Sequence, residues 1–103
     1  MKRLVLAAAL LAQPAAADAD RIALELGSML AAEEPCGLAF DHDAIGDWID
    51  AQVDADDMGF AGNLAMMTQG QAFQIGRMSD SQRAAHCAQT RRVARSMGFT
   101  AAK

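Results

Sequence analysis

Residues 79–98, SDSQRAAHCAQTRRVARSMG, contain every signal that a helix needs, from its start to its end. Ser79 and Gln82 have the Ser-x-x-Gln spacing of a capping box, in which each side chain accepts a hydrogen bond from the other residue's backbone N–H. Gly98 follows the last periodic residue and suits the left-handed position after a helix. The segment predicts a helix that ends at Met97, with an inward face formed by His86, Cys87, Thr90, Val93, Ala94 and Met97.

Two amphipathic helices are predicted in the first half of the chain. The first runs from about residue 18 or 20 to residue 34, where PCG (35–37) ends it, and its apolar face consists of Ile22, Leu26, Met29 and Leu30. The second lies between the N-cap residue Asp41 and a turn at 55–57, and its apolar stripe consists of Ile45, Trp48, Ile49 and Val53. Acidic residues line the other side of the second helix, namely Asp43, Asp47, Asp50 and Asp54.

A third predicted helix, residues 57–75 with Asp56 as its cap, has apolar residues on two sides. One narrow arc is formed by Phe60, Leu64, Met67 and Ile75, and the far side carries Met66 and Phe73 among Gly59, Gly62 and Gly70. A helix that is apolar on both sides is normally buried between neighbours, so we expect this one to be central. Each glycine lowers helix propensity by about 1 kcal/mol, which predicts that these glycines allow another backbone to approach closely.

The sequence therefore predicts an all-α protein, a small four-helix domain over residues 18–103 closed by one disulfide. Alanine, leucine, methionine and glutamine dominate, and tyrosine is absent. Cys36 and Cys87 are the only cysteines, and an even count favours a disulfide in an oxidising compartment. Closing a loop of about 50 residues contributes about 4 kcal/mol in the chain-entropy model. This bond would tie the first interhelix turn to the fourth helix.

Residues 1–17 have the pattern of a cleavable secretory signal peptide. Lys2 and Arg3 precede the apolar run LVLAAALLA (4–12), and a break at residues 13–14 is followed by three alanines (15–17). Nine apolar residues are too few for a membrane anchor, because a spanning helix needs about 20. We expect cleavage after Ala17, which would release a soluble, periplasmic protein that begins at Asp18.

Charge is strongly segregated along the chain. The net charge of −4 becomes −6 without Lys2 and Arg3; residues 18–76 carry −11, and residues 77–103 carry +5. One explanation is that the last helix lies against the acidic middle of the same molecule. The other is that a basic cluster binds an acidic partner, and its candidate residues are Arg91, Arg92 and Arg95. Nucleic acid is not an expected partner, because a net negative charge repels phosphate.

The sequence predicts no catalytic residue, no cofactor and no metal ligand. The set Cys36, His42, His86 and Cys87 has the composition of a zinc site, but its spacing is poor and a disulfide would remove both thiolates. Soft thioether sulfurs bind copper, yet Met29, Met67 and Met97 fall on predicted core faces. The acidic stripe does not fit a calcium loop, and motifs of hydrolases or phosphate binding are missing.

Several short strings resemble one group of short exported alphaproteobacterial proteins that have two cysteines. The strings are PCGL (35–38), DDM (56–58), MMT (66–68), AHCA (85–88) and RRVA (91–94). The resemblance covers most of the chain after the signal and implies no activity. In size and architecture alone, the chain is similar to the periplasmic acid-stress chaperones, although no motif of that family is present.

The leading functional hypothesis from the sequence is an exported, non-catalytic binding or interaction protein of the periplasm. One alternative is an acid-responsive chaperone-like protein, because protonation of the carboxylates and both histidines would change the mature charge from about −6 to about +9. A second alternative is a periplasmic protein that binds copper or zinc. A partner from the periplasm or the envelope is expected under the leading hypothesis.

Overall fold

The computed structural model describes residues 15–101, which form four α-helices and no strand. The helices are α1 (Ala15–Ala32), α2 (His42–Gln52), α3 (Phe60–Gly76) and α4 (Asp80–Met97). Cys36 and Cys87 form a disulfide, so the predicted all-α fold with one disulfide is confirmed. Apart from Ala15 to Ala17, which begin α1, the predicted signal peptide lies outside the described residues. None of the described helices is long and apolar enough to cross a membrane.

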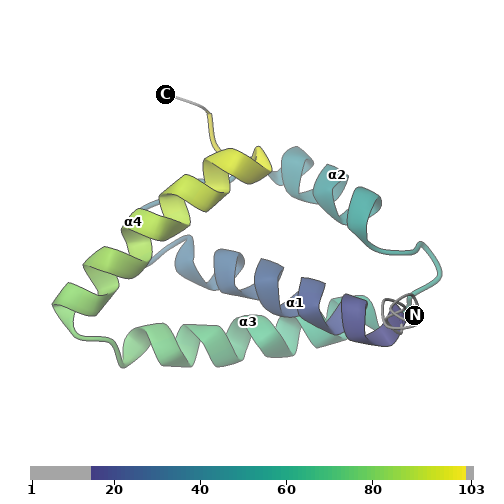
Figure 1. Ribbon diagram of the computed structural model, residues 1–103, viewed down its shortest axis with the longest axis horizontal. Helices are drawn as coiled ribbons and strands as arrows, with labels where there is room; N and C mark the ends of the chain where they lie inside the picture. Colours follow the sequence, from purple (N-terminus) through teal and green to yellow (C-terminus); the bar gives the residue numbers. More distant parts are fainter. Residues whose placement is uncertain (1–14, 102–103) are drawn as a thin grey trace, which may run out of the picture.

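α1 is the central helix of the fold, and α3 packs beside it (Figure 1). The two helices are parallel, because Nδ2 of Asn63 donates a hydrogen bond to Oδ1 of Asp20 (2.9 Å) near their starts and Ile75 packs against Ala31 and Ala32 near their ends. The prediction that the third helix is central was wrong. Of its residues only Phe60 and Ile75 are buried, whereas most of the inward side of α1 is buried, including Ile22, Ala23, Leu26, Met29, Ala31 and Ala32.

α3 approaches α1 closely at Gly27 of α1. A Cβ atom at Gly27 would lie 3.0 Å from Cβ of Met67 and 3.1 Å from the backbone nitrogen of Thr68. Nothing lies within 4 Å of a Cβ atom built at Gly62 or Gly70. The expectation that the glycines of the third helix admit a neighbouring backbone within this chain was therefore wrong, because they face away from α1.

We expect Gly27→Ala and Gly46→Ala to change stability in opposite directions. Alanine is the better helix former by about 1 kcal/mol at both positions. Gly46 lies in α2 with open space around it, so its replacement should raise the free energy of unfolding by up to about 1 kcal/mol. At Gly27 the new methyl group must push α3 away, and overpacking of this kind costs about 1–3 kcal/mol. Urea unfolding of both variants measures the difference; stabilisation by both would show that the helix pair separates without cost.

α2 begins at the residue that the sequence predicted. The carboxylate of Asp41 accepts hydrogen bonds from the backbone nitrogens of Asp43 (2.9 Å) and Ala44 (3.2 Å). The predicted apolar stripe packs against the core through half-buried side chains, Ile45, Trp48, Ile49 and Val53. The expected cap of α3 was wrong, since Gly59 takes the N-cap position there and no side chain caps the helix.

α4 follows its sequence signals at both ends. Oγ of Ser79 accepts from the backbone nitrogen of Gln82 (3.1 Å), and Oε1 of Gln82 accepts from that of Ser79 (2.9 Å). Gly98 ends the helix with a φ angle of 83°. The predicted inward face is confirmed, because Cys87, Thr90 and Ala94 are buried and His86, Val93 and Met97 are half-buried.

α1 ends two residues earlier than predicted, at Ala32. Pro35 disfavours a helical conformation at the residue before it, so the chain turns through residues 33–37 instead. Oε2 of Glu33 accepts a hydrogen bond from the backbone nitrogen of Phe40 (2.8 Å), and Gly37 adopts a φ angle of 66°. This turn places Cys36 against α4.

Phe99, just beyond α4, connects the C-terminal end of α4 with the start of α2. Its ring centroid lies 5.5 Å from that of Phe40 and 6.2 Å from that of Trp48. Its carbonyl oxygen accepts from the backbone nitrogen of Asp41 (2.8 Å), the N-cap of α2. The C-terminal end of α4 and the start of α2 are thereby held together (Figure 1).

Candidate interaction surface

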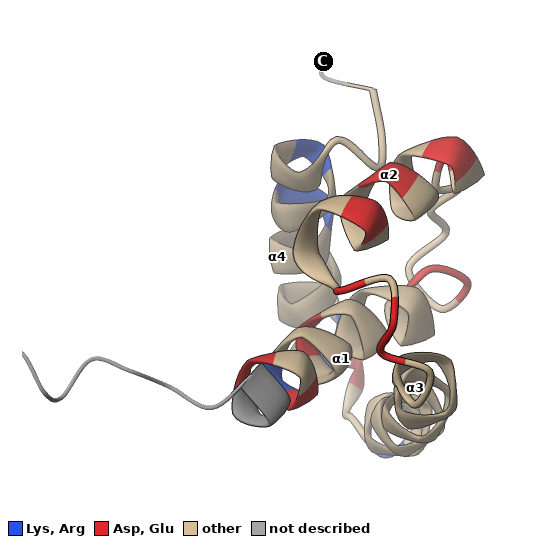
Figure 2. Cartoon of the chain, turned by 90° about the vertical axis from the view of Figure 1, so that its right-hand side faces the viewer, with Lys and Arg blue, Asp and Glu red and all other residues tan. Residues whose placement is uncertain are grey.

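The arginines that the sequence predicted as a partner-binding site lie together on the last turns of α4 (Figure 2). Arg95 is four residues after Arg91 and three after Arg92, and residues at these spacings are neighbours on a helix surface. All three side chains are exposed. We call these three residues the arginine face.

The buried side of α4 fixes the direction of the arginine face. Thr90, next to Arg91, and Ala94, next to Arg95, are buried on the other side of α4, and Oγ1 of Thr90 donates a hydrogen bond to the carbonyl oxygen of His86 (2.8 Å). Cys87, one turn earlier, is bonded to Cys36. Rotation of α4 would expose these residues, so the arginine face is presented on a rigid element.

No carboxylate neutralises the arginine face within residues 15–101. The ion pair found in this part of the chain joins Arg21 and Asp18 of α1, with 3.6 Å between nitrogen and oxygen. Nη1 of Arg92 donates a hydrogen bond to a neutral group, Oε1 of Gln89 (3.3 Å). The described residues of α4 form no ion pair, so the acidic middle of the molecule does not pair directly with the arginine face.

Most acidic residues lie on other elements than the arginine face, although the acidic start of α2 is held beside the C-terminal end of α4. Figure 2 shows acidic positions along α2 and at the start of α1, whereas the arginine face lies toward the C-terminal end of α4. Asp43, Asp47 and Asp50 are exposed, as expected for a solvated face. The protein therefore has two regions of opposite charge, which favours one orientation toward a charged partner.

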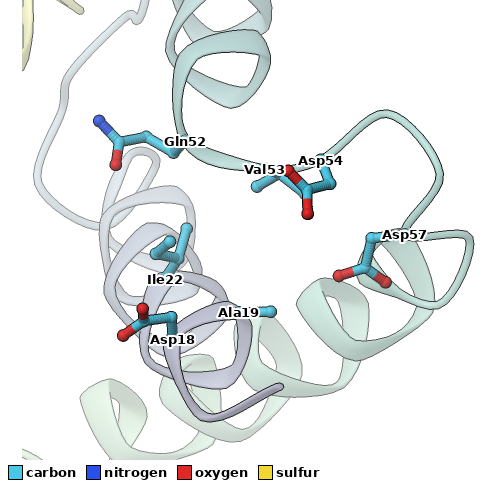
Figure 3. Close-up of a pocket in the computed structure, with 7 residues that line it drawn as sticks. All are labelled: Asp18, Ala19, Ile22, Gln52, Val53, Asp54 and Asp57. Atoms are coloured by element: carbon cyan, nitrogen blue, oxygen red, sulfur yellow. The ribbon is translucent and has the colours of Figure 1, made fainter. Parts of the chain in front are cut away.

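A shallow hollow of about 360 Å³ lies between α1 and the loop that joins α2 to α3 (Figure 3). The carboxylates of Asp54 and Asp57 extend toward it from the loop, and the other lining residues are Asp18, Ala19, Ile22, Gln52 and Val53. Sequence reasoning missed this hollow, because its two walls are distant in the chain and the acidic run at 54–57 indicated only a turn. Within the described residues, no group of three or more acidic, histidine or cysteine side chains is arranged to hold a metal ion.

The predicted disulfide is present, with an S–S distance of 1.99 Å and a Cα–Cα distance of 5.3 Å. Because both sulfurs are bonded to each other, neither is a thiolate that a zinc ion would need. His42 begins α2 and His86 lies in α4, where its Nε2 atom is buried without a hydrogen-bond partner among the described residues. The structure thus does not assemble the four residues that had the composition of a zinc site.

The methionines divide into two groups. Met29 is buried, and Met67 and Met97 pack against the core cluster, as their predicted positions required. Met58 and Met66 are 87% and 70% exposed.

Comparison of the chain with known protein families, curated proteins and solved structures found no match. Function is therefore argued from the residues and their geometry.

Proposed function

We propose that the protein is a non-catalytic interaction protein of the periplasm that binds an acidic partner protein through the arginine face. The observation that carries the proposal is that Arg91, Arg92 and Arg95 are exposed together, without a carboxylate partner in the described residues, on a chain of net charge −4. The export pattern of residues 1–17 supports the compartment, and a disulfide is typical of oxidising compartments.

Electrostatics supports this choice of partner. An acidic protein is repelled by α2 and attracted by the arginine face, so it approaches in one orientation. Guanidinium groups match carboxylates in a bidentate geometry that lysine does not offer. The neighbouring exposed residues of this face of α4, Ala84 and Ala88, are small and leave room for a partner backbone.

Neutralising the arginine face should weaken partner binding by about 3-fold to about 100-fold, since three exposed ion pairs contribute about 0.2–1 kcal/mol each. The variant is R91Q/R92Q/R95Q, and the measurement is quantitative crosslinking and capture from envelope extract at about 50 mM and about 300 mM salt. Binding by the wild type should fall with salt, because exposed charges are screened. The captured protein should be acidic.

A matched control separates the arginine face from net charge. Ala51→Glu, Gln52→Glu and Ala55→Glu together lower the net charge by the same three units, at exposed positions in or after α2. We expect this control to retain binding. An equal loss of partner binding in both variants would show that binding depends only on net charge. Undiminished capture by R91Q/R92Q/R95Q would contradict the proposal. Binding to anionic lipid vesicles without any protein partner would contradict it as well.

A further inference from the structure

The outer face of α3 carries a regular stripe of exposed, uncharged residues. The stripe, which we call the α3 seam, consists of Gly59, Gly62, Met66, Gln69, Phe73 and Gly76. Successive members are three or four residues apart in strict alternation, which is the spacing of a coiled-coil interface. The large apolar members, Met66 and Phe73, are 70% and 64% exposed. α3 forms an edge of the molecule, and no other described helix covers this side (Figures 1 and 2).

The α3 seam is self-complementary in an antiparallel arrangement. A two-fold axis between residues 67 and 68 places Phe73 opposite Gly62 of a second copy, and Met66 opposite Gln69 of that copy. Nothing lies within 4 Å of a Cβ atom built at Gly62, so an aromatic ring has room there. The outermost positions, Gly59 and Gly76, also face each other and permit close approach of the two backbones. Each projecting side chain thereby meets a gap or a flexible side chain.

Charge at the two ends of the seam favours the same arrangement. Residues 60–76 contain no charged side chain, Asp56 and Asp57 precede them, and Arg77 follows. The guanidinium carbon of Arg77 already lies 5.5 Å from the ring centroid of Phe73, at the border of the seam. In the antiparallel pair, Arg77 of each copy lies near Asp56 and Asp57 of the other. A parallel pair would place like charges side by side at both ends.

We propose that α3 forms the interface of an antiparallel homodimer, with Phe73 of each copy packed over Gly62 of the other. The 17 residues of α3 span about 25 Å, and one such helix from each copy buries less than the roughly 800 Å² per partner of a standard interface. The dimer is therefore weak and reversible, with a dissociation constant on the order of 100 µM. It does not involve the arginine face, so R91Q/R92Q/R95Q leaves it intact.

Sedimentation equilibrium from about 10 µM to about 1 mM measures the dimer of the mature, disulfide-bonded protein. Phe73→Glu places a charge in the seam and should raise the dissociation constant by about 30-fold or more, as for a hot-spot residue. Its matched control is Gln74→Glu, which adds the same charge at the adjacent exposed position, away from the seam, and should change the constant by less than about 2-fold.

Gly62→Leu distinguishes a loss of the dimer interface from a loss of monomer stability. Leucine is the better helix former and meets open space in the single chain, so the stability of the monomer should hold or rise. The same leucine fills the gap for Phe73 and should weaken the dimer by about 10-fold or more. A variant that loses dimer without loss of monomer stability cannot be explained by unfolding.

Cysteine crosslinking tests the direction of the pair. A mixture of Met66→Cys and Gln69→Cys chains should form the mixed disulfide faster than either variant alone forms its own, because these two positions face each other only in the antiparallel pair. Faster crosslinking of each variant with itself indicates a parallel pair and overturns the proposal. So does a wild-type protein that stays monomeric at about 1 mM, or equal dimerisation of Phe73→Glu and Gln74→Glu. In the monomeric case, the exposed seam would be a surface for a different protein.

Discussion

Replacing Phe99 by alanine is expected to lower the free energy of unfolding by about 3–5 kcal/mol. The side chain is fully buried, at 0% exposure, and its ring contacts those of Phe40 and Trp48. The loss combines the transfer of a large apolar group with the cavity that remains, because the surrounding helices relax only in part. For a domain with a stability on the order of 5–10 kcal/mol, this is a large fraction.

Phe99→Ala isolates the contribution of the ring. The backbone bonds of residue 99, from its nitrogen to the oxygen of Ala94 (2.9 Å) and from the nitrogen of Asp41 to its oxygen (2.8 Å), are available to alanine as well. Urea unfolding followed by circular dichroism measures the change. Fluorescence reports the same site, because Trp48 is the only tryptophan and should become more solvated.

Phe73→Ala is the control for Phe99→Ala. Phe73 is 64% exposed, so the same truncation should cost less than about 1 kcal/mol in dilute, monomeric protein. A similar loss in both variants would contradict the assignment of Phe99 to the core and Phe73 to the surface.

Removing the disulfide by Cys36→Ala and Cys87→Ala together is expected to cost about 4 kcal/mol. The two cysteines are 51 residues apart, and the crosslink restricts the unfolded chain over that length. The bond also anchors α4, which packs against α1 much less extensively than α3 does. Without it the domain should be marginally folded, and α4 should be the first helix to lose protection from hydrogen exchange.

Chemical reduction provides the control for the disulfide. Dithiothreitol should destabilise the wild type by an amount similar to the double substitution, and it should leave the alanine variant unchanged. Denaturation midpoints and hydrogen exchange measured with and without the reductant test both expectations. A reduced wild type with undiminished stability would contradict a stabilising role of the bond.

The sequence by itself determined those features that depend on residues close together in the chain. The capping box of Ser79 and Gln82, the Asp41 cap and the Gly98 terminus each involve groups within a few residues, so their hydrogen bonds depend on the local helix and not on which elements pack against it. The helical periodicity gave the inward faces of α2 and α4 for the same reason. The disulfide was predictable by count, because only two cysteines are present.

The predicted arginine cluster illustrates the limit of this reasoning. Its spacing on α4 follows from helix geometry, and the exposure of Arg91, Arg92 and Arg95 follows from the buried side of the same helix. Whether acidic residues of the chain neutralise these arginines depends on where α1 and α2 lie. Only the tertiary structure decided this, since charges far apart in sequence are brought together or kept apart by packing.

Tertiary structure also decided which helix is central and which glycine admits a neighbour. The two apolar sides of α3 predicted a buried helix, but burial requires a partner on each side, and within residues 15–101 only α1 covers it extensively. The close approach is made at Gly27 because α1, with its small buried residues Ala23, Ala31 and Ala32, occupies the centre. Periodicity shows which residues share a face of a helix, whereas the three-dimensional arrangement of the helices determines whether anything covers that face.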